Sequence, residues 1–457
     1  MHAAVLIGLF AAICFSQLHM GLRAVAHLDG FWDDDMCRDA AIAQLFTDGQ
    51  PDADSAYLGE RQWYNPLVPA AMSIASQAMH IPIHALYAKG GAYINLVILL
   101  AAFGLVSRLC NLRVALATVL GMAFVVQFSA GSYPYQLHTY QPIMFTTMLG
   151  QVFLYVGWWL VWKRLGNRWT VWTAMGLGAW LGLTFLAHTA AAIQLGMLLC
   201  IAMLFPAWIE PIQPAGVARP AMAQGAALLA LALTVALVVN WPLTKNILFH
   251  YHLQIKNPLP SSWTGHPASL QNLSSLLRSC LQPGSLVTLV GAWCLIVRPY
   301  RTSRLARLVI TWVEIALGWI LLGYLSQAIN AYAGRTTVLV PLPTIHFLIT
   351  LKFIEALLFG YGLVALCNVL TDRLRPWLSA RWVKAKDGAL SGISLALLVC
   401  SVSITACMLY PRQQWALKHY LQSPPNVAEE MPVYDFLRLH ASPSIVVLAR
   451  PAIALCH

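Results

Sequence analysis

Charged residues are scarce in this sequence. Only 10% of its 457 residues are Asp, Glu, Lys or Arg, whereas 59% are hydrophobic. Soluble domains carry about 25% charged residues, so this composition excludes a soluble globule. The net charge of +11 does not by itself indicate a nucleic-acid-binding surface, because its meaning depends on which side of a membrane holds the basic residues.

The sequence also lacks a repeat of fixed period, a long low-complexity linker and any C-x-x-C pair. Seven of its ten cysteines fall in or beside apolar runs, and Cys37, Cys280 and Cys456 lie far apart in polar stretches. Neither pattern has the ligand spacing of a zinc site. We therefore interpret the cysteines as small buried apolar residues.

Long apolar runs are abundant, and each is sufficient to cross a hydrocarbon core of about 30 Å. They predict an all-α polytopic membrane protein with about eleven transmembrane helices. The predicted spans are residues 3–22, 87–107, 114–130, 141–162, 169–186, 190–209, 221–241, 284–298, 308–329, 342–370 and 388–410. The segment from Val68 to His84 is apolar but short and contains Pro82, so we interpret it as a re-entrant or interfacial helix.

The distribution of charge predicts the orientation of these spans. Fifteen of the 28 basic residues fall in five short loops on one side, and nine of the 17 acidic residues crowd into residues 29–60 on the other. The positive-inside rule then predicts a cytoplasmic N-terminus and an extracytoplasmic C-terminus. Ala24-Val25-Ala26 is similar to a signal-peptide cleavage site, but no Lys or Arg precedes the apolar stretch.

We predict two parts of the chain. Residues 1–410 form a transmembrane domain with extracytoplasmic loops at 23–86 and 242–283, and residues 411–457 form a short extracytoplasmic C-terminal segment. That segment contains a helix-like stretch from Val433 to His440 and a strand-like stretch from Ile445 to Ala449. It is too short for an independent core, so it either docks on the membrane domain or is a truncated soluble domain.

The highest concentration of potentially catalytic side chains lies in the first external loop, where Asp33, Asp34 and Asp35 follow one another. Their mutual repulsion must be offset by the positive charge of Arg38, by a divalent cation, or by raised pKa values of the aspartates, which keep one of them protonated. A carboxylate at the membrane face can act as a general base toward a sugar hydroxyl, and a pair can hold Mg²⁺ or Mn²⁺. The alternative is a solvated acidic turn in which Asp34 or Asp35 caps a helix over residues 36–46.

A short first span, an Asp-Asp element early in the external loop and the run from Trp63 to Pro69 (Trp-Tyr-Asn-Pro-Leu-Val-Pro) resemble the GT-C superfamily of integral-membrane glycosyltransferases. Pro341-x-Pro343 and the stretch from Leu358 to Leu363 fit it more loosely. The resemblance implies a GT-C-like fold in a bacterial inner membrane. It also implies that a sugar passes from a polyprenyl-phosphate carrier to a lipid, glycan or protein acceptor outside the cytoplasm.

The resemblance also implies roles for the acidic residues. One of Asp33, Asp34 or Asp35 would be the catalytic base or orienter, with Asp29 as a less favoured substitute. This chain has three successive acids where the superfamily has one or two. If the enzyme uses Mg²⁺ or Mn²⁺, Asp33 and Asp35 are the better pair of ligands, although several members work without metal.

A lipid-linked phosphate requires cations near the external face. Arg335 lies in the loop between the ninth and tenth predicted spans, close to Tyr332, and an arginine suits bidentate phosphate contacts. Trp63 and Tyr64 are candidates for contact with the sugar or the carrier. The alternative for Arg335 is a cation that merely snorkels to the interface.

Lys352 and Glu355 fall inside the tenth predicted span, with His346 nearer the outside. A lone charge at mid-membrane is costly, and the i, i+3 spacing allows the two to neutralise each other. They would line a polar cleft below the active site or form a buried ion pair that joins helices. A rival function is a transporter or lipid flippase with Lys352, Glu355 and Glu314 as its pathway, but no inverted repeat is evident.

Overall fold

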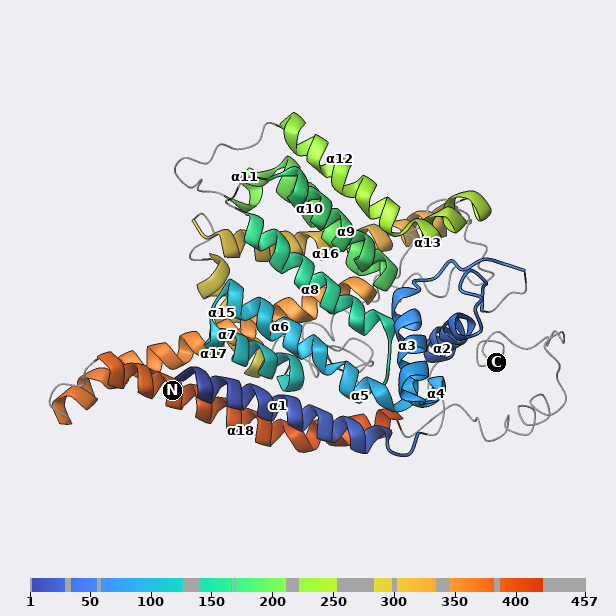
Figure 1. Ribbon diagram of the computed structural model, residues 1–457. Helices are drawn as coiled ribbons and strands as arrows, with labels where there is room; N and C mark the ends of the chain where they lie inside the picture. The colour runs from blue at the N-terminus through green and yellow to red at the C-terminus, as the bar shows by residue number, and fades with distance from the viewer. Residues whose placement is uncertain are drawn as a thin grey trace.

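The protein is an all-α bundle of long helices with a cluster of shorter helices at one end, as the computed structural model shows (Figure 1). The structure describes residues 2–28, 34–55, 59–125, 140, 142–165, 167, 169–210, 222–252, 283–297, 302–333, 345–381 and 387–421. Within these ranges strand-like pairing is limited to one isolated antiparallel bridge, between Ala53 and Arg61.

The elements follow one another as α-helices interrupted by short π-helical turns (η), which insert one residue per turn into a helix. In chain order they are α1 (His2–Val25), α2 (Asp34–Thr47), α3 (Leu67–Met79), α4 (Ile83–Ala85), η1 (Leu86–Gly90), α5 (Gly91–Ile94), α6 (Leu96–Leu109), α7 (Leu112–Leu120), η2 (Gly121–Val125), α8 (Thr146–Arg164), α9 (Val171–Ala187), α10 (Thr189–Leu204), α11 (Pro206–Ile209), α12 (Met222–Val239), α13 (Trp241–Lys245), η4 (Asn246–His250), α15 (Pro283–Ala292), η5 (Trp293–Val297), α16 (Arg304–Ala333), α17 (Ile345–Arg381) and α18 (Asp387–Leu421).

The prediction of an all-α polytopic membrane protein is confirmed, although the count of eleven spans is not. Each predicted span overlaps a described helix. Six helices in the described ranges are long and apolar enough to cross a membrane, and five more apolar helices are shorter. The six are His2–Val25, Ile83–Leu109, Met222–Val239, Arg304–Gly323, Thr350–Pro376 and Ser391–Trp415.

The first and last helices lie side by side along the bundle (Figure 1). The side-chain amides of Gln17 in α1 and Gln413 in α18 bond to each other in both directions, at 3.2 and 3.0 Å, and both are buried. His27 hydrogen-bonds the carbonyl oxygen of Leu421 at 3.0 Å. Helix α18 therefore continues across the predicted boundary at residue 410 and ends beside the start of the first loop.

The secondary structure predicted within the C-terminal segment, from Val433 to His440 and from Ile445 to Ala449, lies outside the described residues. Its docked or truncated character stays a prediction.

Close helix packing holds the bundle centre together. Trp158 of α8 stacks on Trp312 of α16 with ring centroids 3.5 Å apart, and Phe353 of α17 packs against both rings. At Gly291 and Gly362 the backbones of α15 and α17 approach so closely that an added Cβ would overlap the opposite backbone. Small residues of this kind are the usual means of close helix contact in membranes.

Helices α2, α3 and α4 gather at one end of the bundle, on the right in Figure 1. Helix α3 ends at Met79, followed by His80 in the left-handed conformation (φ 53°). Pro82 then precedes α4, where its missing N–H costs nothing because a first-turn N–H has no helical partner. The segment predicted from Val68 to His84 thus forms two helices, α3 and α4, on either side of Pro82. Its re-entrant or interfacial placement stays a prediction.

Two expectations for the first loop are wrong. Helix α2 begins at Asp34, so Asp34 and Asp35 lie in its first turn and neither is its cap. An acidic residue in the first turn still favours the helix, because negative charge is stabilised near the positive end of the helix dipole. Cys37 is disulfide-bonded, not merely a buried apolar residue. Distance along the sequence does not prevent such a bond, because folding brings remote loops together.

Candidate active site

Helix α2 carries one carboxylate on its buried face. Met36, Asp39, Ala40 and Ala43 are all buried, at 3% exposure or less. Their i, i+3, i+4, i+7 spacing is that of a single helix face packed on a core. Asp39 therefore enters the protein because its apolar neighbours on the helix do, and it requires polar partners there.

Arg38 is the centre of the acidic cluster. Its guanidinium donates to Asp35 at 2.6 Å and to Asp39 at 3.1 and 2.9 Å. The same group lies over the ring of Tyr64, 3.7 Å from the ring centroid. Because α2 places Asp35, Arg38 and Asp39 on one face, a single guanidinium binds both carboxylates and a cation–π contact supports it from the other side. We refer to Asp35, Arg38 and Asp39 as the carboxylate–arginine cluster.

Asp39 has a second partner across the bundle. The hydroxyl of Thr146, the first residue of α8, donates to its other carboxylate oxygen. Burial raises the pKa of the Asp39 carboxyl above its ordinary value, and this outweighs the lowering by Arg38 and by the bond from Thr146. The carboxylate also lies at the N-terminal end of α8, where the helix dipole favours a negative charge.

Two hydrogen bonds and one close backbone approach fix Asp39 and Thr146 relative to each other. The hydroxyl of Tyr87 in η1 donates to the carbonyl oxygen of Asp39 at 3.1 Å, and the N–H of Met144 donates to the carbonyl oxygen of Tyr87 at 3.2 Å. Gly91 permits this approach, since a Cβ there would overlap the backbone of Ile143. The segment that leads into α8 is therefore held against η1.

A small polar cavity begins one residue beyond Thr146. It has a volume of about 20 Å³, which is room for one water molecule. The hydroxyl of Thr147 and a ring nitrogen of His188 are 3.1 Å apart, and Thr350 donates to Gln194 across the space between α10 and α17. Its polar lining residues are Thr147, Gln151, Tyr155, His188, Gln194 and Thr350. The polar lining of this cavity thus begins at the residue that follows the Thr146 partner of Asp39.

A second charged group ties the first loop to α13 and η4, which follow α12. Asp52 accepts from Arg61 at 2.8 Å and from the amide of Asn246 at 2.8 Å, and Lys245 lies 3.6 Å away. Partial burial raises the pKa of Asp52, but the bond from Asn246 and the charges of Lys245 and Arg61 outweigh this and hold it below its ordinary value. These contacts join residues 52–61 to α13 and η4.

Of the predicted acidic residues, Asp35 joins the cluster and its side chain is 42% exposed. Asp34 begins α2, but its side chain lies outside the described part. Asp29 and Asp33 also lie outside the described residues. The sequence allowed three ways to offset the repulsion among the aspartates, and the pairing of Asp35 with Arg38 is one of them.

The predicted substrate-contacting residues have different surroundings. Trp63 is 40% exposed and meets the ring of Tyr64 edge-on, with centroids 5.8 Å apart. Tyr64 offers a ring face to Arg38. Tyr332, near the end of α16, is 97% exposed. Arg335 lies outside the described residues.

Lys352 and Glu355 form the predicted ion pair, with 3.0 Å between Nζ and Oε2. Neither lines the polar cavity, to which their helix contributes Thr350. The side chain of His346 on the same helix lies outside the described part.

Glu314, the third member of the rival transport pathway, accepts from the indole of Trp208 at 3.2 Å. Glu314 lies on α16, whereas Lys352 and Glu355 pair with each other on α17. A transport pathway built on these three residues stays a prediction.

Sequence reasoning assigned no role to Asp39 or Thr146. The sequence signal for Asp39 was its helical spacing from the apolar residues Met36 and Ala43, which puts all three on one face of α2. Thr146 gave no such signal, because its partner is 107 residues away along the chain.

A divalent cation held by Asp33 and Asp35 remains a proposal. No group of three or more His, Cys, Asp or Glu side chains suitable for a metal occurs within the described ranges, and Asp33 lies outside them. Of the two proposed ligands, Asp35 already binds Arg38.

No protein-family model and no curated protein sequence matches the chain. Solved structures do resemble it. ArnT from Cupriavidus metallidurans in the apo state has a TM-score of 0.59 at 14% identity, over 100% of this chain and 85% of that one. The same protein bound to undecaprenyl phosphate has a TM-score of 0.56 at 12% identity, over 98% and 84%.

The oligosaccharyltransferase of Archaeoglobus fulgidus in the apo form has a TM-score of 0.57 at 11% identity. The match covers 96% of this chain but 58% of that one, so this chain spans less than two thirds of its length. ArnT and this oligosaccharyltransferase are both GT-C proteins. The chain has the GT-C fold, as the motif resemblance predicted.

Proposed function

We propose that the chain is a membrane glycosyltransferase that moves a sugar from a polyprenyl-phosphate carrier to a lipid, glycan or protein acceptor. The carboxylate–arginine cluster carries this proposal, because it places a solvent-reachable carboxylate at one end of a GT-C bundle with a buried charged support behind it. The solved complex of ArnT with undecaprenyl phosphate supports a lipid-phosphate donor.

We assign the two carboxylates different roles from their exposure. Asp35 is 42% exposed and can meet an acceptor hydroxyl or amine, whereas Asp39 is 1% exposed. Asp35 would be the general base. Asp39 would be a positioning residue that holds Arg38, and through it Asp35, in place.

The transfer step follows from these roles. The acceptor oxygen or nitrogen bonds to the anomeric carbon while the bond from that carbon to the phosphate oxygen breaks. The acceptor proton passes to Asp35, and the carrier phosphate leaves with the bonding electrons. Arg335 would bind that phosphate, and the exposed rings of Trp63 and Tyr332 would stack on the sugar or carrier.

The orientation belongs to the same proposal. With the N-terminus in the cytoplasm and the C-terminus outside, the cluster faces the extracytoplasmic side of a bacterial inner membrane. The disulfide at Cys37 in α2 supports this, because such bonds persist in oxidising compartments and are rare in the cytosol.

A transfer assay with radiolabelled polyprenyl-phosphate hexoses and pentoses tests the proposal on the purified full chain. Asp35→Asn should lower the rate by about 10² to 10⁴, the usual contribution of a general base. Asp48→Asn is the matched control, because Asp48 is exposed and bonds only Gln44 in the described contacts. Full transfer by Asp35→Asn would refute its role as the base, and full transfer by Asp33→Asn and Asp34→Asn as well would refute the proposal.

The same assay decides on the metal. A loss of transfer on chelation that Mg²⁺ or Mn²⁺ restores would support a cation at Asp33 and Asp35. Unchanged transfer after chelation would remove the cation from the proposal.

A further inference from the structure

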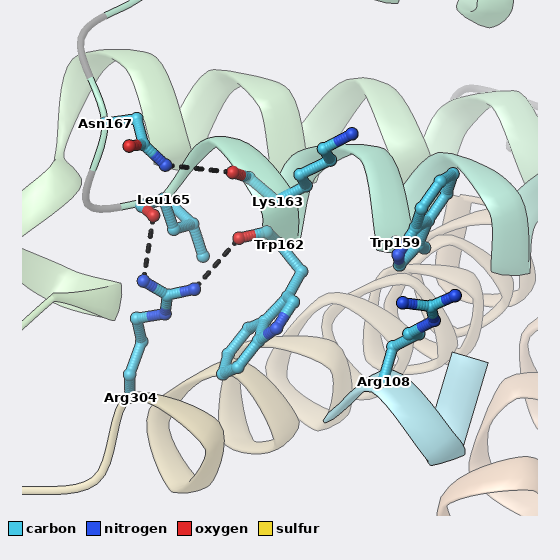
Figure 2. A pocket seen from close by; sticks show the side chains of 7 residues that line it. All are labelled: Arg108, Trp159, Trp162, Lys163, Leu165, Asn167 and Arg304. Carbon is cyan, nitrogen blue, oxygen red and sulfur yellow. Dashed lines mark hydrogen bonds between the residues drawn. The ribbon is translucent and has the colours of Figure 1, made fainter. Parts of the chain in front are cut away.

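A basic cavity lies at the end of the bundle opposite α2, where α6 and α8 end and α16 begins (Figures 1 and 2). Its volume is about 460 Å³, within the size range of small-ligand sites. Arg108, Lys163 and Arg304 contribute three positive charges, and none of the seven lining residues is acidic. The carboxylate–arginine cluster contributes no residue to it.

Arg304 lines this cavity and holds the end of α8 in place. Its guanidinium donates to the carbonyl oxygens of Leu165 at 2.8 Å and Trp162 at 2.9 Å, and it lies 4.0 Å from the Trp162 ring centroid (Figure 2). Glu210 is 3.7 Å from the same guanidinium. Carbonyls at the C-terminal end of α8 would otherwise repel an anion, and Arg304 caps them.

Arg108 and Lys163 are the side chains available to a ligand. Both are exposed. In the described contacts the Lys163 ammonium meets only the ring of Trp159, at 5.6 Å, while its carbonyl oxygen accepts from Asn167. No ion pair to a described carboxylate involves Arg108 or Lys163. Two cations that have no carboxylate partner among the described residues, placed on one cavity, favour an anion that can reach both.

The two tryptophans place the cavity at the height of lipid headgroups. Trp159 and Trp162 are separated by three residues on α8 and share a helix face, immediately before the basic last turn of a helix in a membrane bundle. Tryptophans gather at the membrane–water interface, where an apolar ring meets polar headgroups. Basic pockets between helix ends at this level are suited to anionic headgroups.

We propose that this cavity binds the phosphate headgroup of an anionic phospholipid. Arg108 and Lys163 contact the phosphate, Arg304 holds the wall and adds charge, and Trp159 and Trp162 pack against the glycerol and upper acyl chains. The site is independent of the proposed transfer reaction.

Native mass spectrometry of the purified full chain tests this proposal, with phosphatidylglycerol as the probe and phosphatidylcholine as the neutral comparison. Arg108→Gln/Lys163→Gln should weaken phosphatidylglycerol binding about 30-fold, because each basic residue near an anionic lipid surface contributes a factor of about five. Arg108→Lys/Lys163→Arg keeps both charges and should keep binding, which separates charge from misfolding.

The matched control is Arg164→Gln/Arg373→Gln, which removes two exposed charges outside the cavity. It should leave binding within about twofold. Equal binding of both lipids, or an equal loss in this control, would overturn the proposal. So would displacement of the lipid by millimolar inorganic phosphate, since that outcome assigns the cavity to a soluble anion.

Discussion

The hydroxyl of Thr146 donates to the buried carboxylate of Asp39, and this bond connects the first turn of α8 to the acidic helix α2. It joins a helix at the end of the bundle to one of the long helices within it. The geometry of the proposed active site therefore depends on a residue that does not belong to the acidic loop.

Thr146→Val should destabilise the protein by about 1.5–3 kcal/mol, because it removes a hydrogen bond to a buried charged group. Thermal unfolding of the purified protein in detergent measures this as a lower Tm. Thr234→Val is the matched control, since the Thr234 hydroxyl bonds only the Ala230 carbonyl of its own helix in the described contacts. Equal Tm values for the two variants would contradict the expected role of Thr146.

Arg38 and Asp39 should behave as one unit in a double-mutant cycle. Arg38→Gln alone leaves the Asp39 carboxylate buried without its cation, which costs about 3–5 kcal/mol. Arg38→Gln/Asp39→Asn should cost less than the sum of the two single changes, with a coupling of about 1–3 kcal/mol. Thermal or denaturant unfolding of the four proteins gives the coupling.

The exposed pair of Arg61 and Asp52 provides the comparison cycle. Exposed pairs are screened by solvent, so Arg61→Gln and Asp52→Asn should couple by less than about 1 kcal/mol. A coupling at Arg38 and Asp39 no larger than this would show that the cluster does not act as a unit.

The raised pKa of Asp39 predicts a pH dependence of stability. Between the ordinary pKa of 3.8 and the raised value, the folded protein binds more protons than the unfolded chain. The stability that Asp39 contributes is then fully present below the ordinary pKa and is lost as the pH rises through the folded-state pKa. From pH 4.5 to 8, the Tm of the native protein should therefore fall relative to that of Asp39→Asn.

Asp52→Asn serves as the control for this titration. The lowered pKa of Asp52 stabilises the fold above its ordinary value of 3.8, and this stability is lost as the pH falls through the lower folded-state pKa. Its Tm difference from the native protein should stay constant between pH 4.5 and 8. A constant difference for Asp39→Asn as well would contradict the prediction.

The disulfide at Cys37 offers a test of orientation. In intact spheroplasts, a membrane-impermeant maleimide should label Cys37 only after treatment with an impermeant reductant. In Cys37→Ala the thiol that was bonded to Cys37 is free, so labelling should no longer require the reductant, and this loss of reductant dependence identifies the disulfide. Labelling of Cys37 only in permeabilised cells would reverse the proposed topology and place α2 on the cytoplasmic side.

The sequence predicted the helical elements well, because apolar runs and helix-breaking residues act locally. The ion pair of Lys352 and Glu355 followed from i, i+3 spacing, and the end of α3 before Pro82 followed from the missing proline N–H. In α2 the helical spacing of the apolar residues also predicted that Asp39 is buried. The sequence interpretation instead assigned the catalytic role to the run of three aspartates, Asp33 to Asp35.

Contacts between remote segments could not be predicted in this way. Asp39 and Thr146 are 107 residues apart, and Asp52 and Asn246 are 194 residues apart. Each pair depends on how complete helices pack, for example on the close approach that Gly91 permits. No pattern in either segment alone specifies its partner.

The paired amides of Gln17 and Gln413 have a consequence for biosynthesis. They are 396 residues apart, so at about 5–20 residues per second the ribosome needs about 20–80 s to deliver the second after the first. Through that interval the newly inserted first helix carries a polar amide without its final partner. The contacts of α1 are thus completed only when α18 arrives, which couples assembly of the bundle to translation of a segment 396 residues downstream.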